Sequence, residues 1–245
     1  MDYVQHFFAF EKTYVHAFHN NIVLNKILFK IFYISLFACS AEAVTSMVSL
    51  RRFKSACQFN DENNFNDILN LLEFETTEEK CKILQEVLPI ASEFSMISIF
   101  QGIIKNGVSI NKPDTRGNYA IHYAALSKVD AMEKVSLLYA NNKDCIHWKG
   151  SNERTPLCLA SEACNSSVVE FFLERIKQDY SQDALSEHLT SVLLETCSHT
   201  SFEIVDSFVT YGAKLNIRDA KGFYLIHHAC LSHKDALKKS RAPDF

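Results

Sequence analysis

Two segments of this 245-residue chain share one pattern and lie at a regular distance from each other. Residues 114–125 read DTRGNYAIHYAA and residues 219–230 read DAKGFYLIHHAC, so both contain D-x-x-G-x-x-x-I-H-x-A. Their histidines, His122 and His227, are 105 residues apart, which accommodates three units of 35 residues. A period of this size indicates small supersecondary units that stack on one another. We therefore expect a single repetitive array.

Weaker markers fill the interval between these segments. The sequence TPLCLA, which starts at Thr155, places Cys158 36 residues after His122. The sequences KNGVSIN at 105–111 and TYGAKLN at 210–216 are typical of a helix exit, and counting back from them gives Pro89 and Leu194. The five equivalent positions are then 89, 122, 158, 194 and 227, with spacings of 33, 36, 36 and 33 residues.

The residues at these markers suit helix ends and tight turns. Thr155 is a favourable helix N-cap, and Pro156 fits the first helical turn, where its missing N–H is not needed. Glycine is favoured where a helix exits in a left-handed conformation and where a hairpin turns. Four of the six glycines occupy such positions, namely Gly107, Gly212, Gly117 and Gly222. With few glycines and prolines elsewhere, the composition favours helices.

These segments resemble the ankyrin-repeat family, whose unit of about 33 residues is a turn followed by two antiparallel helices. The resemblance covers residues 82–235, and a weaker half-unit lies at 56–74. It implies an all-α fold, an α-solenoid of about four to five degenerate units with short β-hairpin tips. It also implies that His122 and His227 are structural and bond to neighbouring backbone. Apolar stretches at 97–104, 168–173 and 202–209 are expected to form outer helices.

The domain limits are expected at 1–53 for a hydrophobic N-terminal extension, 54–240 for the repeats and 241–245 for a tail. The apolar run Ile31–Ala41 has three interpretations: a helical extension or cap, a signal or anchor, or translated sequence absent from the mature protein. We expect membrane association only through 22–50 or as part of a larger channel.

The polar stretch Arg175–Glu187 is predicted to be a long linker. Without a polar capping unit at the C-terminal end, either the last half-unit frays or the chain is a fragment.

Composition and motifs point away from catalysis and nucleic acid. The net charge is −4, so no basic excess favours a phosphate backbone. The sequence contains no nucleophile elbow, phosphate-binding glycine loop or H-E-x-x-H motif, and we expect neither a catalytic site nor a cofactor. The eight cysteines lack zinc-site spacing and are expected to be reduced core thiols in a cytoplasmic protein. A metal site formed by His227, His228 and His233 is the weaker interpretation, and we predict none.

The predicted function is to bind another protein. In the ankyrin family, partners lie against hairpin tips and inner helices, and aromatic and arginine side chains often anchor interfaces. Trp148, the only tryptophan, could instead pack onto the adjacent unit. The tip residues predicted to contact the partner are Arg116, Trp148, Lys149, Tyr180, Arg218, Lys221 and Phe223.

Two alternatives remain open at this point. The irregular units and the missing C-terminal cap also resemble, more weakly, the cytoplasmic ankyrin array of ankyrin-type, painless-like transient receptor potential channels. That resemblance implies a regulatory or sensory fragment of a membrane-associated ion channel. The second alternative is a secreted or host-directed ankyrin protein delivered through the segment Ile31–Ala43.

Overall fold

The computed structural model describes residues 41–72, 76–219 and 221–230. The chain divides into two compact units, residues 1–49 and 50–245, and the description below concerns the second. The apolar run at 31–40 and His233 lie outside the described residues. None of the described helices is long and apolar enough to cross a bilayer.

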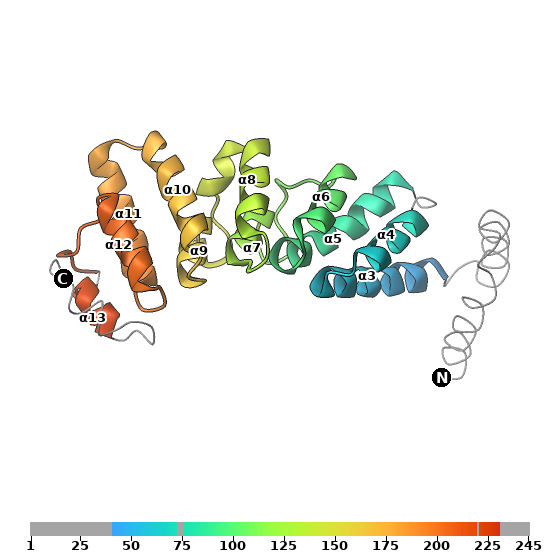
Figure 1. The fold of residues 1–245 in the computed structure, drawn as a ribbon, viewed down its shortest axis with the longest axis horizontal. Helices are drawn as coiled ribbons and strands as arrows, with labels where there is room; N and C mark the ends of the chain where they lie inside the picture. The colour runs from blue at the N-terminus through green and yellow to red at the C-terminus, as the bar shows by residue number, and fades with distance from the viewer. Residues whose placement is uncertain (1–40, 73–75, 220, 231–245) are drawn as a thin grey trace. The chain divides into compact units, whose positions relative to one another are not determined.

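The described chain consists of consecutive helices joined by turns (Figure 1). The helices before the central part are α3 (Ala41–Phe59), α4 (Glu62–Leu71), α5 (Thr77–Phe94) and α6 (Ile97–Lys105). The central helices are α7 (Ala120–Leu126), α8 (Ala131–Asn141), α9 (Pro156–Glu162) and α10 (Ser166–Asp179). The last are α11 (Gln182–Thr196), α12 (Phe202–Thr210) and α13 (Leu225–Cys230). Two short 3₁₀ helices, η2 (Lys143–His147) and η3 (Ser151–Glu153), lie between α8 and α9.

The helices pack in two layers. The inner layer contains α5, α7, α9, α11 and α13, and each of these contacts the next one along the chain. The outer layer contains α4, α6, α8, α10 and α12, which contact one another in the same order. Figure 1 shows the resulting helix pairs side by side. Because each pair is too small to bury its apolar face alone, stacking completes the core. This confirms the predicted all-α solenoid.

Buried apolar side chains follow the helical period on the outer helices. In α12 the side chains of Ile204, Val205 and Phe208 are each at most 1% exposed. The spacing i, i+1, i+4 places them on one face, which packs against α10 and α11. The predicted outer helices at 97–104, 168–173 and 202–209 correspond to α6, α10 and α12, and this prediction is confirmed.

Helix starts are set by side-chain caps. The Thr76 hydroxyl accepts a hydrogen bond from the Glu79 N–H at 3.3 Å, and the Glu79 carboxylate accepts from the Thr76 N–H at 3.4 Å. This capping box fixes the first turn of α5. At α9, Thr155 accepts from the Cys158 N–H at 3.4 Å and Pro156 occupies the first helical turn.

The predicted linker at 175–187 is wrong. Helix α10 continues to Asp179 and α11 begins at Gln182, so only Tyr180 and Ser181 lie between them. Leu185 and Leu189 are four residues apart, and both are buried on the inner side of α11. The polar residues around them therefore belong to the solvated faces of two helices.

Pro89 and Leu194, the predicted equivalents of His122, lie in the inner helices α5 and α11, which begin earlier than α7 does relative to this position, at Thr77 and Gln182. The predicted hairpin tips differ from the structure. The tips are hydrogen-bonded turns, and the described residues contain no strand. An isolated antiparallel bridge joins Arg218 to Tyr224. A short turn whose ends are hydrogen-bonded to each other pairs the same backbone N–H and C=O groups that a hairpin would pair.

A lysine side chain lies in the core. Lys134 in α8 is fully buried, and its Nζ donates to the Ser92 carbonyl oxygen and to Ser127 Oγ, both at 3.1 Å. Ser127 Oγ is itself 2.6 Å from the Glu93 carbonyl oxygen. Burial lowers the pKa of Lys134 to about 8. These bonds tie α8 to α5 and to the turn after α7.

Candidate functional site

Two turns at the outer-to-inner connections have the same backbone structure. In the turn between α6 and α7, the Asp114 N–H donates to the Asn118 carbonyl at 2.8 Å and the Gly117 N–H donates to the Asp114 carbonyl at 3.0 Å. The turn between α12 and α13 repeats these bonds at 2.8 Å and 2.9 Å, with Asp219 and Gly222 in the same roles. Glycine is required in both, because φ is +83° at Gly117 and +85° at Gly222.

The aspartate side chain organises each turn. Asp114 Oδ1 accepts from the N–H groups of Arg116 and Asn118, both at 2.9 Å. Asp219 Oδ1 accepts from the N–H groups of Lys221 at 2.9 Å and Phe223 at 2.8 Å. The same side-chain bonds at both sites hold the residue two positions after the aspartate, Arg116 or Lys221, in an equivalent place.

A second contact anchors each aspartate to its inner helix. Asp114 Oδ2 accepts from the Tyr123 hydroxyl at 2.5 Å, and Asp219 Oδ2 lies 3.0 Å from His228 Nε2. Partial burial acts to raise the pKa of Asp114, but its hydrogen bonds, led by that from Tyr123, lower the pKa overall. The hydrogen bond from the Phe223 N–H leads the lowering of the Asp219 pKa. Both carboxylates are therefore stabilised in their charged form.

His122 joins the first turn to the next unit. Its Nδ1 accepts from the Tyr119 N–H at 3.2 Å, so Nε2 carries the proton and donates to the carbonyl oxygens of Trp148 and Arg154, both at 3.1 Å. Burial lowers the pKa of His122 and favours the neutral ring. Gly150 lies close to this site: a Cβ there would be 2.8 Å from His122 Nε2.

His227 occupies the same motif position but a different environment. Its Nδ1 accepts from the Tyr224 N–H at 2.9 Å, as His122 does from Tyr119, yet the His227 side chain is exposed. The part of the chain covered by the structure contains no group of three His, Cys, Asp or Glu side chains that could hold a metal ion.

The connection between α8 and α9 is braced against the first turn. The half-buried Trp148 ring lies 4.5 Å from the Tyr119 ring, so it packs onto the neighbouring unit. Asn118 Oδ1 accepts from the Ser151 N–H at 2.8 Å. Lys149 stays exposed and pairs with Glu153 at 2.9 Å. Trp148 is therefore only partly available to a partner, whereas Lys149 is exposed and paired with Glu153.

The remaining predicted residues lie at two other connections. Tyr180, between α10 and α11, is 37% exposed and stacks on His188 with ring centroids 5.3 Å apart. At the last turn, the Arg218 guanidinium lies 4.7 Å from the centre of the Tyr224 ring. Phe223 is 47% exposed in the same turn. The seven residues thus form separate groups along one edge, because each connection leads into the N-terminal end of an inner helix.

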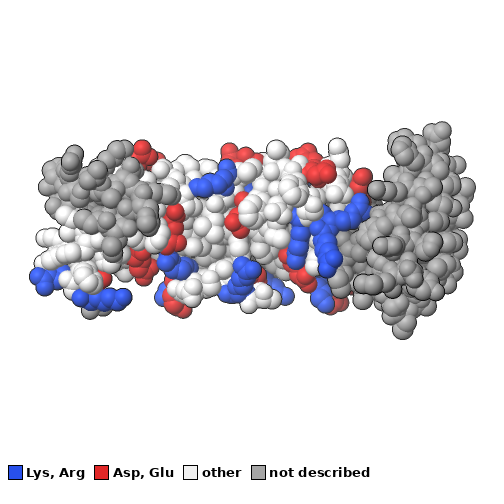
Figure 2. Space-filling view, turned by 90° about the horizontal axis from the view of Figure 1, so that it is seen from below, with Lys and Arg blue, Asp and Glu red and all other residues white. Residues whose placement is uncertain are grey.

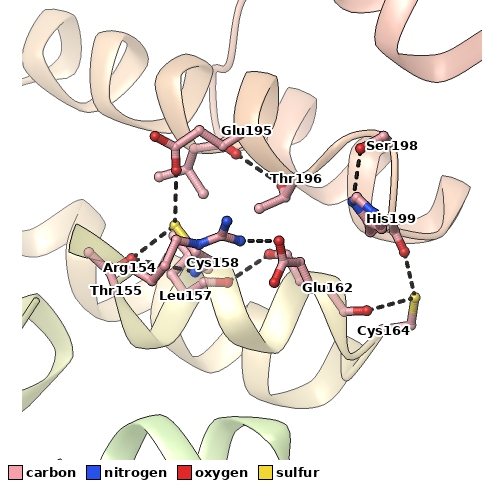
Figure 3. A network of polar contacts seen from close by, with 12 residues as sticks. Arg154, Thr155, Leu157, Cys158, Glu162, Cys164, Glu195, Thr196, Ser198 and His199 are labelled. Carbon is pink, nitrogen blue, oxygen red and sulfur yellow. Dashed lines mark hydrogen bonds and ion pairs between the residues drawn. The ribbon is translucent and has the colours of Figure 1, made fainter. Parts of the chain in front are cut away.

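A polar network links α9 to α11 on the inner layer (Figure 3). Arg154 forms an ion pair with Glu162 at the other end of α9. Cys158 Sγ lies 3.3 Å from Thr155 Oγ1 and 3.8 Å from Glu195 Oε2. The repeat motifs do not include Arg154, Glu162 or Glu195. Their charges, just before α9, at the end of α9 and in α11, are the signal that the sequence offers.

Comparison with a protein-family model supports the repeat pattern. The family model described as ankyrin repeats (3 copies) matches residues 88–184, which extend from α5 into α11. No curated protein matches the chain significantly. Residues 88–184 are therefore ankyrin repeats, and the chain resembles the ankyrin-repeat family.

Proposed function

We propose that this chain is a non-enzymatic module that binds another protein through its tips and inner helices. Ankyrin repeats generally mediate protein–protein interaction. The observation that carries the proposal is the construction of the tips. Exposed side chains such as Arg116, Lys221 and Phe223 project from turns that internal hydrogen bonds hold in one conformation.

Rigid turns favour binding for a physical reason. Ordering a loop on association costs conformational entropy, and a preformed loop avoids that cost. In both matched turns, one aspartate closes the loop through its carboxylate and its own N–H. The exposed residues of these turns can therefore contact a partner without refolding.

We also propose a cytoplasmic location. Burial raises the pKa of Cys57 and of Cys145 to about 12, and it also raises that of Cys158. Cys57, Cys81, Cys145 and Cys158 are free thiols. Such thiols persist in the reducing environment of the cytoplasm.

Site-specific photo-crosslinking in the full chain tests the binding surface. A benzoylphenylalanine at position 149 or 223 reports on two tips, and one at Glu170 reports on the exposed side of outer helix α10. In source-cell lysate, we expect the two tip positions to capture the same protein and position 170 not to. Capture of that protein at 170 alone, with circular dichroism unchanged, would place the interface elsewhere.

A paired substitution complements this experiment. Arg116→Ala together with Trp148→Ala removes an exposed cation and a half-buried ring at neighbouring tips. We expect the crosslinker at position 223 to capture less of the partner protein in this variant, while the helicity measured by circular dichroism stays unchanged. Undiminished capture would show that these two tips do not contribute to binding.

A further inference from the structure

The connections that lead from an outer to the next inner helix are more basic than the rest of the chain. Between α6 and α7, α8 and α9, α10 and α11, and α12 and α13, the sequence contains eight Lys or Arg and four Asp or Glu residues. The whole chain has a net charge of −4. The edge formed by these connections is therefore positive on a negative protein, which favours an acidic partner by charge complementarity.

The acidic residues at this edge are largely engaged. Asp114 and Asp219 are bound by their own turns, and Glu153 pairs with Lys149. Among the described residues, Arg116 and Lys221 form no ion pair, and both are exposed. Each of these two turns therefore presents an unpaired cation at the second position after the aspartate, and the last turn also presents Arg218, whose guanidinium lies over the Tyr224 ring.

Arg116 and Lys221 are a matched pair. They are 105 residues apart and follow aspartates with the same four hydrogen bonds, whose lengths agree within 0.1 Å. Helix α5 precedes the connection that contains Arg116, and helix α11 precedes the connection that contains Lys221. A polar side chain of each helix bonds to the backbone of that connection. Gln85 donates to the Ser109 carbonyl at 3.1 Å, and Thr190 accepts from the Lys214 N–H at 2.8 Å.

We propose that the partner binds this edge with an extended acidic segment whose two negatively charged groups contact Arg116 and Lys221 together. This proposal rests on the proposed protein-binding function and names the chemistry of its partner. The two turns are separated by three steps of the stack. Neighbouring helices pack about 8–10 Å apart, so the two cations are about 24–30 Å apart. An extended chain covers about 3.3 Å per residue, so about seven to nine residues separate the two acidic groups.

An acidic polypeptide suits this arrangement better than a nucleic acid does. A phosphate backbone carries a charge at every nucleotide and favours a continuous basic track. Here the region between the two turns contains acidic side chains, including Asp144 and Asp179. Two acidic blocks joined by an uncharged spacer match a surface on which acidic side chains lie between the two cations. On the face seen from below in Figure 2, basic side chains likewise form several separate groups with acidic ones between them.

Labelled peptides on the full chain test the proposal by fluorescence anisotropy. One peptide has two Glu-Glu blocks about eight uncharged residues apart, and a second has the same composition with the blocks about two residues apart. Linking two weak contacts raises affinity only when the linker spans both sites. We expect the long-spaced peptide to bind about tenfold more tightly than the short-spaced one. Equal affinities would overturn the proposal.

Substitutions assign the effect to the two turns. Arg116→Ala and Lys221→Ala should each reduce binding of the long-spaced peptide to the level of the short-spaced one. The matched control is Arg51→Ala, which removes an exposed cation from α3 and should leave both affinities unchanged. The double reversal Arg116→Glu with Lys221→Glu should transfer the spacing preference to peptides with Lys-Lys blocks. A reversal variant that still prefers the Glu peptide would contradict the assignment.

The remaining outcomes separate this proposal from the function on which it depends. Tighter binding of a single-stranded oligonucleotide than of the long-spaced peptide would overturn the acidic-segment proposal. If the spacing preference is absent while positions 149 and 223 still crosslink a common protein, the acidic segment is wrong and tip binding stands. If both experiments fail, the proposed function is wrong as well.

Discussion

Replacing Lys134 by methionine should remove a pH dependence from the stability of the protein. The side chain is fully buried against the Ser92 carbonyl oxygen and Ser127 Oγ. Burial lowers its pKa from 10.5 to about 8. Below pH 8 the folded protein holds a buried ammonium, which disfavours folding relative to the exposed ammonium of the unfolded chain.

The sign and size of the effect follow from these two pKa values. Between pH 8 and 10.5 the unfolded chain binds more protons than the folded one, so this group makes the protein more stable as pH rises. The full change is about 3 kcal/mol, and about 1 kcal/mol of it falls between pH 7 and 9. The free energy of unfolding of the wild type should therefore rise by that amount relative to Lys134→Met.

Urea unfolding followed by circular dichroism at pH 7, 8 and 9 measures this difference. The methionine leaves the Ser92 carbonyl without its lysine donor, a cost that does not depend on pH. Lys82→Met, a change of the same kind on the exposed side of α5, is the control and should track the wild type. If the curves of wild type and Lys134→Met stay parallel from pH 7 to 9, the argument about the buried ammonium is refuted.

Three further changes should be measured by the same urea assay. His122→Ala should destabilise the protein by about 1–3 kcal/mol because two carbonyls of the α8–α9 connection, those of Trp148 and Arg154, lose a buried donor. The exposed His227→Ala should cost clearly less. Equal losses would contradict the structural role of His122. Gly117→Ala should cost about 1 kcal/mol or more because φ is +83° there, and a neutral result would count against that turn. Thr155→Ala should cost about 1 kcal/mol through the lost cap on the Cys158 N–H, and an unchanged midpoint would argue against the cap.

The fold could be predicted where one residue type determines local structure. A glycine at positive φ and a threonine before a proline leave few alternatives, so the sequence indicates the turn at Gly117 and the start of α9 directly. The stretch 175–187 was mispredicted because its polar residues concealed a helical period. Leu185 and Leu189 form that period on the buried side of α11, and Ser181 is its N-cap residue.

The side-chain environments at the candidate site required the structure. The sequence around Trp148 does not indicate whether its ring faces solvent or the Tyr119 ring, because that depends on how two units pack. Lys134 reads as a solvated residue beside Glu133, yet stacking against α5 encloses it. Long-range packing decides both cases, and a local pattern does not encode it.

Amide hydrogen exchange of the full chain, alone and bound to the protein captured at positions 149 and 223, tests the central claim most directly. The account predicts slower exchange in the turns at 114–118 and 219–223 and in the connection at 148–155, with little change in outer helices α8, α10 and α12. Protection confined to those outer helices, with unchanged exchange in the turns, would contradict binding through the tips.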